Sequence, residues 1–129
     1  MAGNERGETV KIYLAHNFAA REYLKSIIKL LEDNSHTITS RWITDDEHLK
    51  DSHAMLSAVH DLEDVEAASD LILFANQFAD SPGAGKFVEL GYALRAGKRI
   101  IVIGDGRCVF YNLPNIRHAK TIEEALVLL

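Results

Sequence analysis

The chain lacks several features that would assign it to particular classes of protein. Cysteine occurs once, at Cys108, so no internal disulfide can form, which is typical of a reducing, cytoplasmic location. No apolar run approaches the roughly 20 residues that a membrane-spanning helix needs. Positive charge is in the minority, since 14 Lys and Arg against 19 Asp and Glu give a formal net charge of −5. That balance argues against nucleic acid or an anionic membrane as a partner.

What is present is typical of one globular domain. The 129 residues are 47% hydrophobic and 26% charged, which is enough for a single core. Residues 1–9 are mostly polar and lack the apolar stretch of a signal peptide. We therefore expect a flexible N-terminal tail at residues 1–9 and one domain at residues 10–129.

Strand and helix patterns alternate along the chain. Apolar and β-branched runs predict strands at 10–15, 36–43, 71–75 and 99–103. Helical spacing predicts helices at 18–34, in pieces across 45–69, at 86–97 and at 121–129. This alternation predicts an α/β fold with a parallel sheet covered on both faces. Ligands of such folds bind beyond the carboxyl ends of the strands.

The segment from Ser81 to Leu94 organises the predicted site. Small residues and Pro82 lead into a helix with a buried face, and Glu89 lies near its start among apolar neighbours. Glu89 is either an acidic residue favoured by the helix dipole or a functional carboxylate at the rim of the sheet. Gly91, inside the helix, suggests that backbone or ligand approaches closely there.

A second carboxylate could face the same rim. Asp61 and Asp64 belong to an acidic stretch that precedes the third predicted strand. Two carboxylates facing one pocket suit cleavage at the anomeric carbon of a sugar, because one stabilises or attacks the cationic centre and the other protonates the leaving group. The alternative is a solvated acidic helix face.

Other motifs are less informative. Gly85-Lys86 is not a nucleotide-triphosphate P-loop because the required first glycine and the Ser or Thr are absent, although its backbone N–H groups could still approach an anion. Trp42 could be a core residue or could stack on a planar ligand. The histidines of the acidic segment lack metal-ligand spacing, so we expect no metal site.

Three stretches together resemble a known family. They are Ile-Tyr-Leu-Ala in the first strand, Asp-Leu-Glu-Asp-Val before the third, and Gly-Lys-Phe-Val-Glu-Leu-Gly-Tyr-Ala-Leu in the organising segment. In this order they resemble the nucleoside 2-deoxyribosyltransferase family, which includes the 2′-deoxynucleoside 5′-phosphate N-hydrolases. The likeness spans roughly Lys11 to Leu126. It implies a flavodoxin-like, Rossmann-like three-layer domain with a five-stranded parallel sheet, and a homodimer or higher homo-oligomer.

The resemblance also implies a chemistry. Glu89 matches the family's nucleophile, which attacks the anomeric carbon and forms a glycosyl-enzyme ester. Asp61 matches the aspartate that protonates the departing base, but the match needs one extra residue after it, so Asp64 stays an alternative. Tyr13 lies on the strand that floors the sugar pocket, and Asn112 lies near a polar group that some members insert into a neighbouring subunit's site. No metal or redox cofactor is implied.

One departure from the family concerns phosphate. The phosphate-using members carry a serine and an arginine in the first loop, where this chain has His16 and Phe18. A 5′-phosphate would then need other donors, such as His16, Asn17, Arg21, Lys86 or the loop amides of Gly83 to Gly85. A rival phosphoribohydrolase signature fits less well, because Pro82 to Glu89 is one residue too short and lacks its threonine. The residues that we expect to contact substrate are Tyr13, Ala15, His16, Asn17, Trp42, Gly83, Gly85, Lys86 and Asn112.

These inferences predict an enzyme that acts on a small molecule. The expected reaction is cleavage of the N-glycosidic bond of a nucleoside or nucleoside 5′-monophosphate, a 2′-deoxy one in particular. A deoxyribosyltransferase that passes the sugar to a second base is an alternative, and so is a non-catalytic nucleotide-binding module. Hydrolase and transferase differ in how well water is excluded from the intermediate, which sequence does not determine.

Overall fold

A single parallel sheet organises the chain. The computed structural model describes residues 7–46, 53–75 and 84–129. Within them the strands are β1 (Lys11–Ala15), β2 (Thr37–Ile38), β3 (Asp70–Phe74), β4 (Arg99–Ile103) and β5 (Ile116–Ala119). Their order is β2-β1-β3-β4-β5, and every pairing is parallel. This is the flavodoxin-like order that the resemblance implied, with its switch point between β1 and β3.

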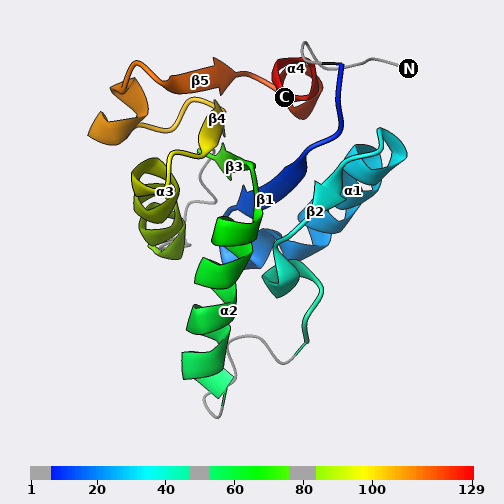
Figure 1. Cartoon of the computed structure of the whole chain (residues 1–129), viewed down its shortest axis with the longest axis vertical. Helices are drawn as coiled ribbons and strands as arrows, with labels where there is room; N and C mark the ends of the chain where they lie inside the picture. The colour runs from blue at the N-terminus through cyan, green and yellow to red at the C-terminus, as the bar shows by residue number, and fades with distance from the viewer. Residues whose placement is uncertain (1–6, 47–52, 76–83) are drawn as a thin grey trace.

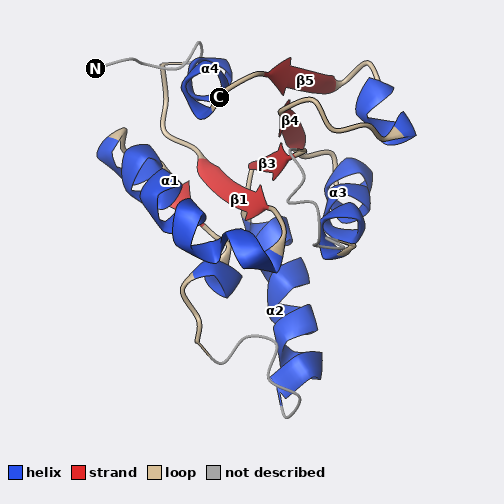
Figure 2. Cartoon of the chain, turned by 180° about the vertical axis from the view of Figure 1, so that it is seen from behind, coloured by secondary structure: helices blue, strands red, loops and turns tan. Residues whose placement is uncertain are grey.

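Helices cover both faces of the sheet. The four α-helices of the described residues are α1 (Arg21–Asp33), α2 (Ala54–Ala67), α3 (Gly85–Arg95) and α4 (Ile122–Leu128). α1 and α4 cover one face, and α2 and α3 cover the other (Figures 1 and 2). This is the arrangement that right-handed crossovers between parallel strands produce. The three-layer prediction is therefore confirmed.

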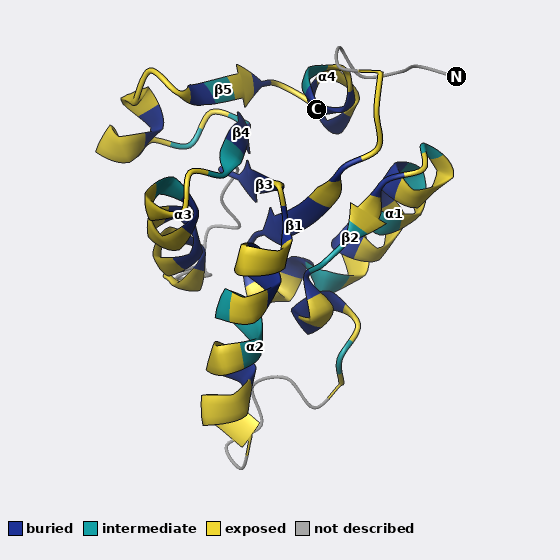
Figure 3. Ribbon diagram, in the orientation of Figure 1, coloured by how far each residue is buried: buried dark blue, intermediate teal, exposed yellow. Residues whose placement is uncertain are grey.

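The core lies along the central strands. All five residues of β3 are buried, as are the last four of β1 and of β4 (Figure 3). Strands buried on both faces have continuous apolar sequences, which is why the predicted bounds of these three strands lie close to the observed ones. Side chains alternate between the faces, so Tyr13 and Ala15 point toward α2 and α3, while Leu14 points toward α1.

The predicted strand at 36–43 is wrong in length. Only Thr37–Ile38 pair with β1, and a 3-10 helix, η2, follows at Arg41–Ile43. Past Ile38 the chain hydrogen-bonds both to β1, through Thr39 N–H to the Ile12 carbonyl at 2.8 Å, and to α2. The Thr39 hydroxyl donates to the backbone oxygen of Asp64 at 2.7 Å, and the Arg41 N–H donates to the Asp64 carboxylate at 2.9 Å. An alternating β-branched pattern could not reveal these partners.

Two further expectations need correction. The residue pattern gave no strand at Ile116–Ala119, where β5 forms an edge whose two middle residues, Arg117 and His118, are not buried. Only the family resemblance implied a fifth strand. The long acidic segment yields one helix, α2, and residues 47–52 lie outside the described part of the chain. A Cβ added to Gly91 would meet no described atom within 4 Å, so no described backbone approaches it, and a ligand there stays a prediction.

Close backbone approach occurs instead at Gly106, and it gives a stability prediction. An added Cβ would overlap the carbonyl oxygen of Ala75, just beyond β3. We expect Gly106→Ala to lower the free energy of unfolding by about 1–3 kcal/mol, as overpacking does. Urea denaturation checks this, with Gly91→Ala as the control that should be neutral or slightly stabilising because the space is open and helix propensity rises. Equal destabilisation of the two variants would contradict the assignment.

Candidate active site

A buried hydrogen bond joins the first strand to the organising helix. The Tyr13 hydroxyl donates to Oε2 of Glu89 at 2.6 Å. Tyr13 has no exposed surface, and Glu89 is 8% exposed. Tyr13 comes from the middle of β1 and Glu89 from the second turn of α3, beside the switch point of the sheet. The glutamate that sequence singled out is therefore directed inward, and the alternative of a solvated first-turn residue is excluded.

Burial changes the acidity of this pair. It raises the pKa of Glu89 to about 8, while the Tyr13 hydrogen bond pulls that pKa down and the negative charge of Asp61 pushes it up. Burial also raises the pKa of Tyr13, with a further contribution from the charge of Glu89. Tyr13 therefore stays a neutral donor. A donor aimed at the carboxylate favours its charged form, which is the form that can act as a nucleophile.

The structure separates the two candidate acids by their partners. Asp64 is buried against Arg41, whose Nε lies 2.9 Å from Oδ1 and whose backbone N–H donates to Oδ2. Its carboxylate is therefore committed to an ion pair that pins α2 to η2. Asp61, one turn earlier on α2, has its pKa raised to about 7 by burial and by the charge of Asp64, with Arg41 acting in the opposite direction. A carboxyl that titrates near neutrality suits a general acid, so the arrangement favours Asp61.

Arg41 is the functional residue that sequence reasoning missed. Its guanidinium also donates to Glu63 at 3.2 Å, so it binds two adjacent acids of α2. A lone arginine after a predicted strand carries no signal by itself. The neighbouring acids Glu63 and Asp64 were the available hint. Glu63 is exposed, but Asp64 is buried, and a buried carboxylate needs a cation.

Three predicted contact residues follow one another at the end of β1. Ala15 is fully buried. His16 accepts the backbone N–H of Asn17 at 2.7 Å on its Nδ1. Asn17 is 1% exposed, yet neither of its side-chain amide atoms has a hydrogen-bond partner among the described residues. Buried polar groups are normally satisfied, so this amide calls for an explanation.

Of the remaining predicted contact residues, some lie near the candidate site and others lie away from it. Lys86, in the first turn of α3, is buried, and its Nζ donates to the carbonyl of Phe74 at 3.4 Å. Gly85 begins α3, and Gly83 lies outside the described residues. Trp42 is a core residue whose Nε1–H donates to the carbonyl of Leu14 at 3.0 Å. Asn112 is exposed on the 3-10 helix η4 (Val109–Asn112), so this chain does not direct it to its own site.

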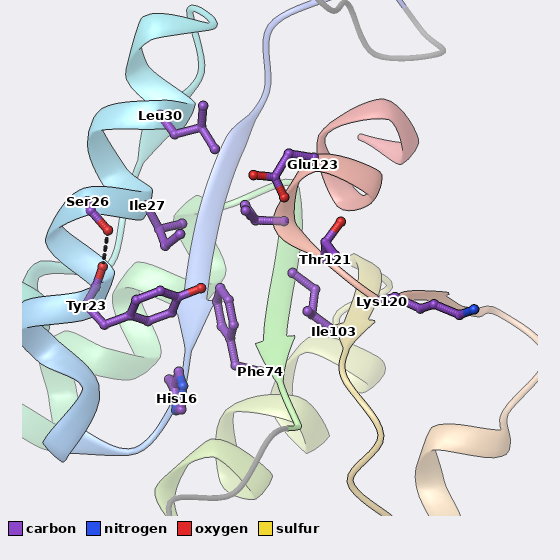
Figure 4. Close-up of a pocket in the computed structure, with 11 residues that line it drawn as sticks. His16, Tyr23, Ser26, Ile27, Leu30, Phe74, Ile103, Lys120, Thr121 and Glu123 are labelled. Atoms are coloured by element: carbon purple, nitrogen blue, oxygen red, sulfur yellow. Dashed lines mark hydrogen bonds between the residues drawn. The ribbon is translucent and has the colours of Figure 1, made fainter.

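A separate groove opens on the opposite face of the sheet. It measures about 670 Å³ and lies between α1 and α4 (Figure 4). The His16 ring forms one end of it, stacked on Phe74 at 5.1 Å, with the Tyr23 ring edge-on to Phe74. Neither Tyr13 nor Glu89 lines this groove. His16 therefore faces away from the two acids.

The described residues contain no group of three His, Cys, Asp or Glu side chains placed to hold a metal ion. None of their helices has both the length and the apolar character needed to cross a membrane. Among the described residues, the candidate site contains carboxyls, a phenol, an amide and an ammonium.

Two solved structures share this fold. The CMP N-glycosidase BcmB of Clostridium botulinum superposes with a TM-score of 0.60 at 17% identity, covering 90% of this chain and 94% of its own. A 2-deoxyribosyltransferase from Bacillus psychrosaccharolyticus superposes with a TM-score of 0.70 at 19% identity, covering 90% of each chain. No family model and no curated protein sequence matches the chain. The chain has the deoxyribosyltransferase-like fold that the sequence resemblance implied.

The raised pKa values of Glu89 and Asp61 predict how stability depends on pH. The pKa is about 8 in the folded state for Glu89 and about 7 for Asp61, against ordinary values of 4.5 and 3.8. The folded state then binds protons that the unfolded chain has released, so the free energy of unfolding falls as pH rises toward 8. Burial and Lys86 lower the pKa of His16 from 6.5 to about 4, which has the opposite effect but only below pH 6.5.

We therefore expect stability to fall between pH 6.5 and 8. Glu89→Gln should flatten this fall because the amide cannot titrate, whereas Glu32→Gln, on the exposed face of α1, should leave it unchanged. Urea denaturation at a series of pH values measures the slope. A slope unaffected by Glu89→Gln would show that Glu89 titrates normally in the folded protein.

Proposed function

We propose that this protein is an enzyme that cleaves the N-glycosidic bond of a nucleoside or nucleoside 5′-monophosphate. The observation that carries the proposal is the buried pair of Tyr13 and Glu89 with Asp61 close enough to perturb it, beside the switch point of a flavodoxin-like sheet. The two structural neighbours, a CMP N-glycosidase and a 2-deoxyribosyltransferase by name, support the same class of reaction.

The proposed first step transfers the sugar to the enzyme. A Glu89 oxygen attacks the anomeric carbon, the carbon–nitrogen bond breaks, and its electron pair leaves with the base. Asp61 donates its proton to the departing base, and its pKa of about 7 lets it hold that proton at neutral pH. The Tyr13 hydrogen bond lowers the pKa of Glu89, which increases the charged fraction available for the attack, and it orients the carboxylate. Arg41 and Asp64 hold the turn of α2 that carries Asp61.

The second step releases the sugar. Water attacks the anomeric carbon of the glycosyl ester, Asp61 accepts a proton from it, and Glu89 leaves as a carboxylate. If a second base replaces water, the same residues perform deoxyribosyl transfer, which is the alternative activity. A binding module that has lost turnover is the remaining alternative, and the retained Glu89 and Asp61 argue against it. A cytoplasmic location remains part of the proposal, because Cys108 is the chain's only cysteine.

A substrate panel tests the activity. Ribo- and deoxyribonucleosides and their 5′-monophosphates are incubated with the protein, and free base is quantified by chromatography, with and without a second base to detect exchange. We expect base release that falls to background in Glu89→Gln and by about 100- to 10,000-fold in Asp61→Asn, as loss of a general acid does. Asp64→Asn should lower the rate less and should also destabilise the fold. Absence of base from every substrate, or full activity in Glu89→Gln, would overturn the proposal.

We also propose that two copies associate through an apolar face of α3 and η4. Phe87, Leu90, Gly91, Leu94, Cys108 and Phe110 line a hollow of about 300 Å³ there. Exposed apolar side chains flank it, including Val88 and Val109 at 64% and 75% exposure. Contiguous exposed apolar surface of this kind marks an interface, and the family resemblance supplies a second copy as the occupant.

The mass of the protein in solution tests this association. We expect sedimentation at twice the mass of the chain, and at the mass of a single chain for Val109→Asp, because a charge would be buried in the interface. Val127→Asp, a matched change on the exposed side of α4, should leave the assembly intact. A monomeric wild-type protein would refute the interface.

A further inference from the structure

The groove between α1 and α4 is a cavity that the proposed function leaves unused. Its volume of about 670 Å³ lies within the roughly 300–1,000 Å³ that small-molecule sites occupy. Neither Tyr13 nor Glu89 lines it, because both lie on the other face of the sheet. The groove is therefore separate from the candidate active site, and its own walls decide what it can bind.

Aromatic rings form one end of the groove. The His16 ring is stacked on Phe74, and the Tyr23 ring meets Phe74 edge-on with centroids 6.2 Å apart. Phe74 is buried, whereas Tyr23 is 49% exposed and extends from α1 toward Phe74 (Figure 4). An exposed ring beside a buried aromatic pair offers a surface against which a further flat ring can pack, at centroid distances of roughly 4.5–7 Å.

Aliphatic side chains form the rest of the groove. They come from α1, from the end of β4 and from the first turn of α4, and they are Ile27, Leu30, Ile103 and Ile122. All four are buried or partly buried in the core. Small-molecule sites combine an apolar lining of this kind with a few polar groups that fix the orientation of the ligand.

One carboxylate faces this groove. Glu123 lies in the first turn of α4, and its side chain is directed into the groove (Figure 4). Its carboxylate has no hydrogen bond or ion pair within residues 7–46, 53–75 and 84–129. Thr121 and Glu124 cap the helix instead, because Thr121 accepts the N–H of Glu124 at 3.1 Å and Glu124 accepts the N–H of Lys120 at 2.8 Å. Glu123 is therefore available to a ligand.

The charges around the groove favour a cation. Lys120 is the one lysine or arginine among the described residues that line it, and its side chain points away from the aromatic rings (Figure 4). His16 is neutral at pH 7, because burial and the charge of Lys86 lower its pKa to about 4. The charge that faces inward is therefore that of Glu123. A carboxylate beside aromatic rings is a combination that binds organic ammonium groups, through an ion pair and through attraction to the rings.

We propose that the groove between α1 and α4 binds a small aromatic amine. The ring of the amine packs against Tyr23 beside the pair of His16 and Phe74, its apolar part covers the aliphatic side chains, and its ammonium group donates to Glu123. A carboxylate of the same shape would be repelled by Glu123. The inference does not use Glu89 or the cleavage reaction, so it is independent of the proposed function.

Isothermal titration calorimetry with 2-phenylethylamine and tryptamine tests the site, and 3-phenylpropionate is the anionic probe of similar shape. We expect 3-phenylpropionate to bind at least about 10-fold more weakly than either amine, since it loses the charge-assisted contact. Glu123→Gln should weaken amine binding by about 10-fold, and Tyr23→Leu by about 5-fold. Tyr23→Phe, which keeps the ring, and Glu32→Gln, on the exposed face of α1, should bind like the wild type. The substituted side chains are exposed, so the variants should fold.

Two further measurements locate the bound amine. Glu89→Gln should bind it as tightly as the wild type does, because Glu89 lies on the other face of the sheet. Amide chemical shifts should move at His16, Phe74 and Glu123 and stay constant at Phe110, in the apolar hollow of α3 and η4. Three outcomes would overturn the inference: no binding of either amine at about 10 mM, equal binding by Glu123→Gln, or shifts confined to the hollow. Each would leave the cleavage activity to be decided by its own substrate panel.

Discussion

The hydrogen bond between Tyr13 and Glu89 is the contact on which the proposed chemistry depends. It places a carboxylate where water is scarce, between the central strands and a helix, and it supplies the donor that such a carboxylate needs. Without the donor, burial would favour the protonated and unreactive form still more strongly. Without burial, the carboxylate would be solvated and weakly nucleophilic. The two effects oppose each other, and the balance leaves Glu89 able to gain or lose a proton near neutral pH.

Sequence located the elements whose signal is local. β1, β3 and β4 are apolar runs buried on both faces, and the helices between them have regular periodicity, so their positions followed from pattern alone. β2 and β5 are edge strands with few residues, and their limits depend on distant partners. Just past β2, for example, the N–H of Arg41 donates to Asp64, 23 residues further along the chain. No local pattern contains that information.

Some residues of the candidate site could be identified from the sequence, and others required the structure. Glu89 and Tyr13 were identified through the family resemblance. Helix patterns alone left open that Glu89 is an acidic residue favoured by the helix dipole. The choice between Asp61 and Asp64 required coordinates, since both lie in one acidic stretch and differ only in whether a cation pairs with them. The unsatisfied amide of Asn17 had no sequence signal at all. Satisfaction of a buried group is a property of three-dimensional neighbours.

The charged side chains of α2 and α3 form one arrangement. Asp61, Asp64 and Glu89 lie on the α2 and α3 side, where negative charge would stabilise a sugar that becomes cationic as its bond to the base breaks. The same charges would repel an anionic substituent on that sugar. Lys86 stands one helical turn before Glu89, so α3 presents a cation and a carboxylate in sequence along one face.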